Sequence, residues 1–214
     1  MTMTRLARSL TAAAAVLLLT MFVTPLWRID LIAPQYPEGL GMLIHLNTVT
    51  GIQPNDLENI NALNHYIGMK RIDPEAIPVL RVMPWVVGAL AAGAFLVALV
   101  GRRGALAGWL VAFGVAGALG MYEFWWWQYD YGHDLAADAI IKVPGMSYQP
   151  PLIGAKQLLN FTAISWPSLG SVAAALAFGC GALALWLSMR RRLLAAVPRS
   201  PAARRVAAAG AAAA

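Results

Sequence analysis

The chain contains a single cysteine among its 214 residues, Cys180. One thiol cannot form an intramolecular disulfide, a Cys-x-x-Cys redox pair, a cysteine zinc site or the covalent attachment of a c-type haem. Charge is also scarce, because only 12% of the residues are charged, compared with about 25% in soluble domains. Hydrophobic residues make up 59% of the chain and the mean hydropathy is +0.61. This composition indicates a membrane protein.

Four apolar segments are long enough to cross the hydrocarbon core of a bilayer, which takes about 20 helical residues. We therefore predict an all-α integral membrane protein with four transmembrane helices. The first segment also resembles a cleaved signal peptide, but no small-x-small site follows Val23, so we interpret it as an uncleaved helix. The predicted parts are a cytoplasmic N-terminus at 1–9, spans at 10–27, 77–100, 106–127 and 169–189, outer loops at 28–76 and 128–168, a turn at 101–105 and a tail at 190–214.

The distribution of charged residues predicts the orientation. Arginine without any acidic residue occupies the segment before the first span, the GRRGA turn and the segment after the last span. By the positive-inside rule these segments are cytoplasmic, which places both termini inside. All acidic residues except Glu123 lie in the two outer loops. The net charge of +6 therefore indicates topology and contact with anionic lipid, not nucleic acid. The low-complexity tail is predicted to be disordered.

The two outer loops, 28–76 and 128–168, hold most of the residues outside the spans. Loops of this length are usually functional or disordered. These loops are rich in aromatic residues, proline and glycine, so they can bury enough surface to order against each other. We predict that they form a small extracytoplasmic cap on the helical anchor.

A short helix is predicted in the first loop. Asn55 or Asp56 can cap its start, and Gly68 can end it. His65 and Met69 lie four residues apart, so they would project from one face of this helix. That face differs from the apolar stripe, which is formed by Ile60, Leu63 and Ile67.

Histidine and methionine side chains of the outer loops form a candidate metal site. Imidazole and thioether groups suit copper, and thioethers suit Cu(I) in particular. The alternative interpretation is that the methionines pack the core of the cap and that each histidine makes a local hydrogen bond. The candidate ligands are His65, Met69, His133, His45, Met146 and Met42.

Other signals are weaker. No histidine lies within a predicted span, which argues against a haem held between helices by two histidines. The aromatic run Trp125–Trp127 at the outer end of the third span predicts an interfacial belt, with a quinone pocket as the alternative. Arg81 and Glu123 stand at the outward ends of two spans, where opposite charges can pair.

The sequence has no GxSxG, P-loop or HExxH motif, and no enzymatic activity is predicted.

Four stretches of the outer loops carry a resemblance: APQYPEGLGM (33–42), INALNHYIGMK (60–70), YDYGHDL (129–135) and IKVPGMSYQPPLIGAKQLLNFTAISWP (141–167). They resemble the small four-helix bacterial membrane proteins encoded in nitrous oxide reductase gene clusters. Such clusters build a periplasmic copper enzyme and supply it with copper, sulfur and electrons. The resemblance therefore implies an accessory role at the periplasmic face of the inner membrane. It implies no catalytic residues.

Two functional hypotheses follow. The first is a non-enzymatic accessory or assembly factor whose cap contacts Cu(I) or docks a maturation partner of the copper enzyme. The second is a membrane subunit that supports electron transfer from quinol to periplasmic carriers for nitrous oxide reduction. That role would need a partner to carry the redox centre, because the sequence offers no haem or iron–sulfur ligation. A transporter is disfavoured by the lack of mid-membrane charge. Gly88 with Ala92, and Gly114 with Ala118, would permit close packing in a homo-oligomer.

Overall fold

The structure is a computed structural model that describes residues 2–196. The helices are α1 (Arg5–Thr20), α2 (Asp56–Ile67), the short 3-10 helix η1 (Pro74–Ala76), α3 (Pro78–Val100), α4 (Arg103–His133) and α5 (Leu169–Ala196). The strands are β1 (Trp27–Ala33), β2 (Tyr36–Ile44), β3 (Val49–Gly51), β4 (Gly154–Leu158) and β5 (Phe161–Pro167). Most of the tail predicted to be disordered, residues 197–214, lies outside the described residues.

The all-α prediction is wrong, because the two outer loops build a five-stranded antiparallel sheet with the order β3-β2-β1-β5-β4. In β1, Trp27, Ile29 and Leu31 are buried while Arg28 and Ile32 are exposed. This alternation is the pattern of a strand with one covered face. The sequence hides this alternation because Trp27 continues the apolar run of the first predicted span.

The prediction of four membrane spans is also wrong. Three helices, α3, α4 and α5, are long and apolar enough to cross a membrane. Helix α1 has 16 residues and a length of about 24 Å, which is less than the core thickness of about 30 Å. The apolar run continues to Trp27, but the helix ends at Thr20, a turn and Pro25 follow, and Trp27 begins β1.

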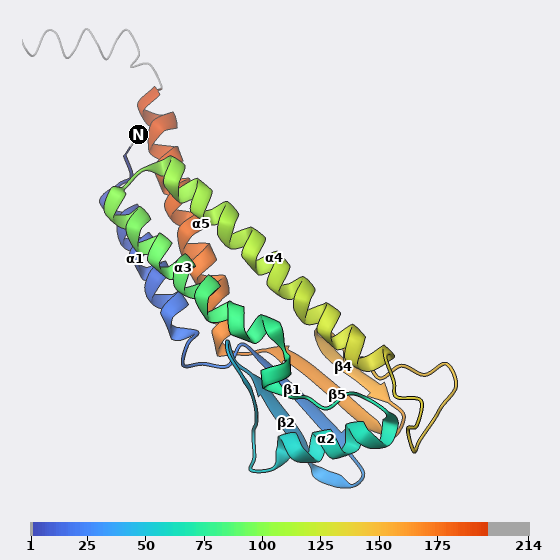
Figure 1. The fold of residues 1–214 in the computed structure, drawn as a ribbon. Helices are drawn as coiled ribbons and strands as arrows, with labels where there is room; N and C mark the ends of the chain where they lie inside the picture. The colour runs from blue at the N-terminus through green and yellow to red at the C-terminus, as the bar shows by residue number, and fades with distance from the viewer. Residues whose placement is uncertain (1, 197–214) are drawn as a thin grey trace, which may run out of the picture.

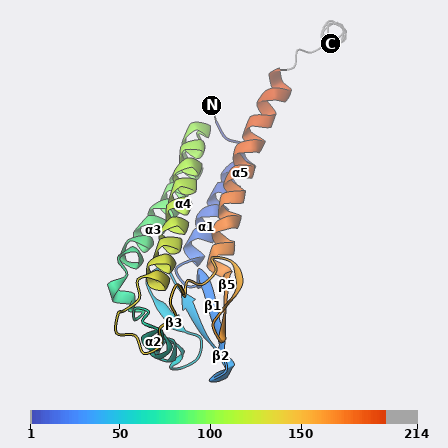
Figure 2. The same ribbon diagram turned by 90° about the vertical axis from the view of Figure 1, so that its right-hand side faces the viewer.

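Helices α1, α3, α4 and α5 pack side by side as a bundle (Figure 1). Its core contains alanines with no exposed surface, including Ala7, Ala14, Ala94 and Ala184. Small side chains let helix backbones approach closely. Near the start of α1, Met3 N donates to the carbonyl oxygen of Gly101 at 2.6 Å. The described start of the chain therefore lies at the α3–α4 turn, at the same end of the bundle as the end of α5 (Figures 1 and 2).

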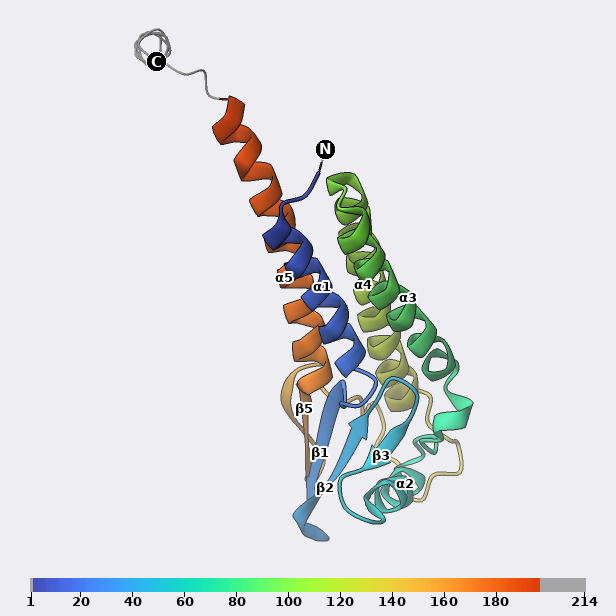
Figure 3. The same cartoon turned by 90° about the vertical axis from the view of Figure 1, so that its left-hand side faces the viewer.

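The sheet and α2 form a domain at the opposite end of the bundle (Figure 1). Helix α2 and the C-terminal part of α4 cover the inner face of the sheet, whereas no helix in the described chain covers the outer face (Figures 2 and 3). Helix α2 confirms the short helix predicted in the first loop, and it ends at Gly68 in the left-handed conformation with φ +79°. Ile60 and Ile67 are buried as expected.

Helix α4 is longer than the predicted third span. It has 31 residues and continues to His133, so its last turns belong to the sheet domain. Trp125 and Trp126 are exposed on the outside of the helix, as an interfacial belt requires. Trp127 instead packs against Tyr131, with ring centroids 4.8 Å apart, in the domain core. The helix thus joins the bundle rigidly to the domain.

Candidate functional site: a cavity between the sheet and two helices

A cavity of about 440 Å³ lies between the inner face of the sheet, α2 and the C-terminal end of α4. Its walls are mainly apolar and include Ile29 of β1, Ile60 of α2 and Phe161 of β5. Tyr66 and Ile141, which are exposed, line its edge. Among the described residues that line the cavity, none is charged and none is histidine. The site therefore offers an apolar, electrically neutral environment.

Asn64 brings an amide into this cavity from α2. It lies four residues after Ile60 and three before Ile67, and this spacing puts all three side chains on the buried face of the helix. Only 5% of Asn64 is exposed. Its Nδ2 atom has no hydrogen-bond partner in the described protein. Asn64 is thus a polar group set into an apolar stripe.

Gln128 and Trp127 bring further polar atoms from α4. Gln128 lies between Phe124 and Tyr131 with the same four-and-three spacing, and it is 1% exposed. The Phe124 ring packs on Trp27 of β1 with centroids 5.0 Å apart, which turns this face of α4 towards the sheet. Both amide atoms of Gln128 and Nε1 of Trp127 lack a hydrogen-bond partner among the described residues.

Tyr148 comes from the long segment between α4 and β4, residues 134–153. Tyr148 N donates to the carbonyl oxygen of Gly132 at 2.9 Å, and this contact brings the segment against the end of α4. A Cβ atom on Gly132 would lie 2.4 Å from Gln149 N, so only glycine allows this approach. Tyr148 is 2% exposed, and its hydroxyl has no partner within the described chain.

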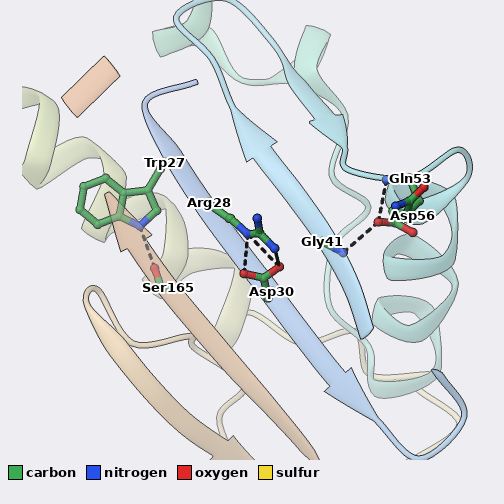
Figure 4. Close-up of polar contacts among 7 residues, drawn as sticks. All are labelled: Trp27, Arg28, Asp30, Gly41, Gln53, Asp56 and Ser165. Atoms are coloured by element: carbon green, nitrogen blue, oxygen red, sulfur yellow. Dashed lines mark hydrogen bonds and ion pairs between the residues drawn. The ribbon is translucent and has the colours of Figure 1, made fainter. Parts of the chain in front are cut away.

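Two buried polar side chains hold α2 in place and are themselves satisfied. The Asp56 carboxylate accepts hydrogen bonds from the backbone N–H groups of Gly41 and Gln53, both at 3.0 Å (Figure 4). The Asn61 amide donates to the carbonyl oxygen of Ile72 at 3.2 Å and accepts from its N–H at 2.7 Å. These bonds tie the start and middle of α2 to β2 and to the segment after the helix. The cavity wall is therefore a fixed element.

Lys70 links the end of α2 to the end of α4. Its ammonium group lies 2.8 Å from carboxylate oxygens of both Asp130 and Asp134. The hydrogen bonds to these two carboxylates raise the pKa of Lys70 above its ordinary value. All three side chains are substantially exposed, so each pair stabilises the fold by less than about 1 kcal/mol.

The structure gives each candidate histidine different surroundings. His65 is exposed on α2, next to Tyr66. His133 stacks on Tyr129 with ring centroids 4.0 Å apart, and its Nδ1 contacts the Tyr129 carbonyl oxygen at 2.9 Å. His45 is half-buried, its Nε2 lies 3.3 Å from the Thr50 hydroxyl, and burial lowers its pKa. Among the described residues no group of three or more His, Cys, Asp or Glu side chains is arranged to hold a metal ion.

The candidate methionines also have different surroundings. Met42 is buried and Met69 is half-buried, and both line the 440 Å³ cavity. Met69 follows Gly68, where α2 ends, so His65 and Met69 do not share a helical face as predicted. Met146 lies in the segment before β4, where its N–H donates to the carbonyl oxygen of Val143 at 3.1 Å.

His45 lines a second, smaller cavity at the junction of the bundle and the sheet. This cavity has a volume of about 190 Å³. Three methionines share it with His45: Met21, Met83 and Met121. Glu123 also lines it, whereas Arg81 donates to the backbone carbonyl oxygen of Glu75 at 2.5 Å. Imidazole and thioethers are ligands that suit Cu(I). These three methionines come from predicted spans and not from the outer loops that hold the candidate ligands.

The polar groups of the larger cavity belong to no metal-ligand set and no catalytic motif, so such patterns do not reveal them in the sequence. The helix periodicity does mark two of these residues. Asn64 interrupts the apolar stripe of α2, and Gln128 takes the equivalent position between two aromatic residues of α4. A polar residue on a stripe that must be buried is informative. Tyr148 has no such local signal, because its burial depends on contacts of an irregular segment.

Comparison of the chain with known protein families and with curated proteins finds no match. Function must therefore be argued from the site and from the placement of charge.

Proposed function

We propose that this protein is a non-enzymatic accessory protein of the bacterial inner membrane that docks a partner of the nitrous oxide reductase system on its periplasmic side. The helices anchor the protein. The sheet and α2 form the domain that meets the partner. Both ends of the chain are cytoplasmic in this proposal.

The separation of charge between the two ends of the molecule carries the proposal. The arginines Arg5, Arg8, Arg102, Arg103 and Arg190 belong to the end of the bundle that is farthest from the sheet. The acidic residues other than Glu123 lie at the other end, on β1, β2, α2, the η1 segment, the last turn of α4 and the segment that follows α4. Because arginine-rich ends of membrane helices stay in the cytoplasm, the domain would face the periplasm.

The uncovered outer face of the sheet supports docking. Ile32 of β1 projects from it with 48% of its surface exposed. On the same face Arg28 forms an ion pair with Asp30 at 2.8 Å, and the hydrogen bond to Asp30 raises the pKa of Arg28. An exposed apolar residue beside a charged pair is typical of a protein interface, where an apolar centre has a polar rim.

The resemblance to proteins of nitrous oxide reductase clusters supports the identity of the partner system. Three of the four stretches that carry it fall on the domain, and the fourth, 129–135, covers the end of α4 next to the domain and the two residues after it. Residues 33–42 contain the β1–β2 turn and most of β2, 60–70 cover most of α2, and 141–167 contain β4 and β5. If the resemblance reflects a shared role, that role belongs to the periplasmic domain.

A deletion strain tests this proposal. In the bacterium that encodes the chain, deletion should abolish or strongly reduce nitrous oxide reduction while the copper enzyme is still synthesised. Complementation with wild type should restore reduction. Unchanged nitrous oxide reduction in the deletion strain would refute the proposed function.

Two matched variants then test the docking face. Ile32→Arg places a charge on the outer face of the sheet and should lower nitrous oxide reduction at a normal membrane level of the protein. Ile140→Arg, at an exposed isoleucine between α4 and β4, should leave reduction unchanged. Equal effects of both variants would argue against docking through the sheet face.

A further inference from the structure

Four residues that line the 440 Å³ cavity carry five buried side-chain atoms without hydrogen-bond partners. These residues are Asn64, Trp127, Gln128 and Tyr148. Among the described residues only one other buried side-chain atom lacks a partner, the hydroxyl of Ser188 in α5. An unpaired buried polar group destabilises a folded protein. The gathering of these unpaired atoms at one cavity indicates that a bound ligand completes their hydrogen bonds.

These groups reach the cavity from three separate elements. Asn64 comes from α2, Trp127 and Gln128 from α4, and Tyr148 from the segment that follows α4. Three of them, Asn64, Gln128 and Tyr148, are at least nine-tenths buried. Hydrogen bonds of Asp56, Asn61 and Tyr148 N already hold these elements in position. The polar groups are therefore preorganised and not left over from a loosely packed region.

The chemistry of the lining defines the ligand. No charged side chain is present among the described residues that line the cavity, so an ion would lie there without a counter-charge. Of the five unpartnered atoms, Asn64 Nδ2, Gln128 Nε2 and the indole Nε1 are donors, the Tyr148 hydroxyl can donate as well, and only Gln128 Oε1 is limited to accepting. Donors attract acceptor oxygens and repel cations. The cavity therefore suits an uncharged molecule that carries carbonyl oxygens.

Size and shape favour an apolar ring over water alone. The 440 Å³ of the cavity is far more space than a single water needs. Ordered water also needs several polar partners, whereas most of the wall is apolar. Trp127, Tyr131, Tyr148 and Phe161 provide aromatic surfaces, which pack well against a planar ring.

We propose that this cavity binds an uncharged, largely apolar molecule whose carbonyl oxygens accept hydrogen bonds from Asn64, Trp127, Gln128 and Tyr148. A quinone ring and the ester region of a glycerolipid both present this chemistry. The inference does not depend on the docking partner proposed above. It concerns the purified protein alone, so either proposal can fail without the other.

Calorimetric titration of the full chain in lipid nanodiscs tests the inference, with empty nanodiscs as the blank. The probes are 1,4-naphthoquinone, dioctanoylglycerol and naphthalene, which has the ring of the quinone without its carbonyl groups. We expect saturable binding of the quinone or of the glycerolipid, and much weaker binding of naphthalene. Quinone binding identifies the ring as the source of the carbonyl groups, and glycerolipid binding identifies the lipid.

Two variants remove the polar atoms and keep the side-chain size. Tyr148→Phe and Gln128→Met should each raise the dissociation constant of the carbonyl probe by about two- to tenfold. This is the change expected when a complex loses one typical hydrogen bond. Neither should lower the melting temperature of the ligand-free protein, because each removes an unpaired buried polar group. Tyr129→Phe, on the exposed side of α4, is the control and should bind as wild type.

Three results would overturn the inference. The first is no saturable binding of either carbonyl probe. The second is naphthalene binding as strongly as naphthoquinone, which would make the cavity merely apolar. The third is unchanged carbonyl-probe binding in both Tyr148→Phe and Gln128→Met while their melting temperatures fall, which would give these groups a structural role.

Discussion

The indole Nε1 of Trp27 donates a hydrogen bond to the hydroxyl of Ser165 at 2.8 Å (Figure 4), and this bond joins the two central strands β1 and β5. Both side chains are buried. The Ser165 hydroxyl in turn donates to the carbonyl oxygen of Leu152 at 3.0 Å. One serine thus connects residues from the two halves of the chain and secures the segment that leads into β4.

We expect Ser165→Ala to lower the free energy of unfolding by about 1–3 kcal/mol, because it leaves the buried indole N–H and the Leu152 carbonyl without partners. Thermal or denaturant unfolding in detergent measures the change. Thr162→Ala on the outward face of β5 is the control, and a surface change of this kind costs less than about 0.5 kcal/mol. Equal stability of Ser165→Ala and wild type would contradict the structural role of the bond.

Gly132→Ala should displace the segment that carries Tyr148. The added Cβ would meet backbone atoms of Gln149 at 2.4 and 2.5 Å, and such overpacking costs about 1–3 kcal/mol. Gly108→Ala in the same helix meets no atom within 4 Å and should be tolerated. Limited proteolysis of residues 134–153 compares the two variants. Equal cleavage rates would argue against the close approach.

His45 should make stability depend on pH near its titration range. Burial lowers the pKa of His45 below its ordinary value of 6.5, so between these two values the unfolded state binds more protons than the folded state. The free energy of unfolding therefore rises with pH through this window, falls as the pH drops through it, and has no further contribution from His45 below it. Unfolding curves between pH 5 and 8 should show a smaller pH dependence for His45→Gln than for wild type. An unchanged slope would rule out this contribution.

The copper contact predicted from the sequence stays a prediction, and the structure indicates where to test it. His45 lines the 190 Å³ cavity together with Met21, Met83 and Met121. If this group contacts Cu(I), then His45→Ala and Met83→Leu should each lower Cu(I) affinity at least about tenfold, which corresponds to 1.4 kcal/mol. His65→Ala, on exposed α2, should have no effect. The absence of Cu(I) binding by wild type under reducing conditions would end this hypothesis.

Reporter fusions test the proposed orientation. A reporter that is active only in the cytoplasm should be active after residue 103, in the basic turn between α3 and α4, and inactive after residue 55, just before α2. The opposite pattern would place the sheet domain in the cytoplasm and would overturn the proposed function. Fusion points within the three long apolar helices should be avoided, because they interrupt the spans.

The sequence by itself determined the apolar helices and one short helix. Helix α3 runs from Pro78 to Val100, where the sequence predicts a span at 77–100, and α2 has the predicted apolar stripe and the predicted end at Gly68. These features depend on local properties. Helical hydrogen bonds join residues four apart, and hydropathy and capping act over neighbouring turns.

Only the tertiary structure decided the sheet and the cavity. Strand β1 pairs with β5, so Trp27 stands opposite Pro167, and no local pattern selects a partner that far along the chain. The same pairing closes the first loop on the second and buries Tyr148 beside Asn64 and Gln128. Asn64 and Gln128 interrupt the buried stripes of their own helices, but nothing in either segment shows that they share a cavity with Tyr148. They form a site because strand hydrogen bonds are made between segments, and burial depends on what those segments bring together.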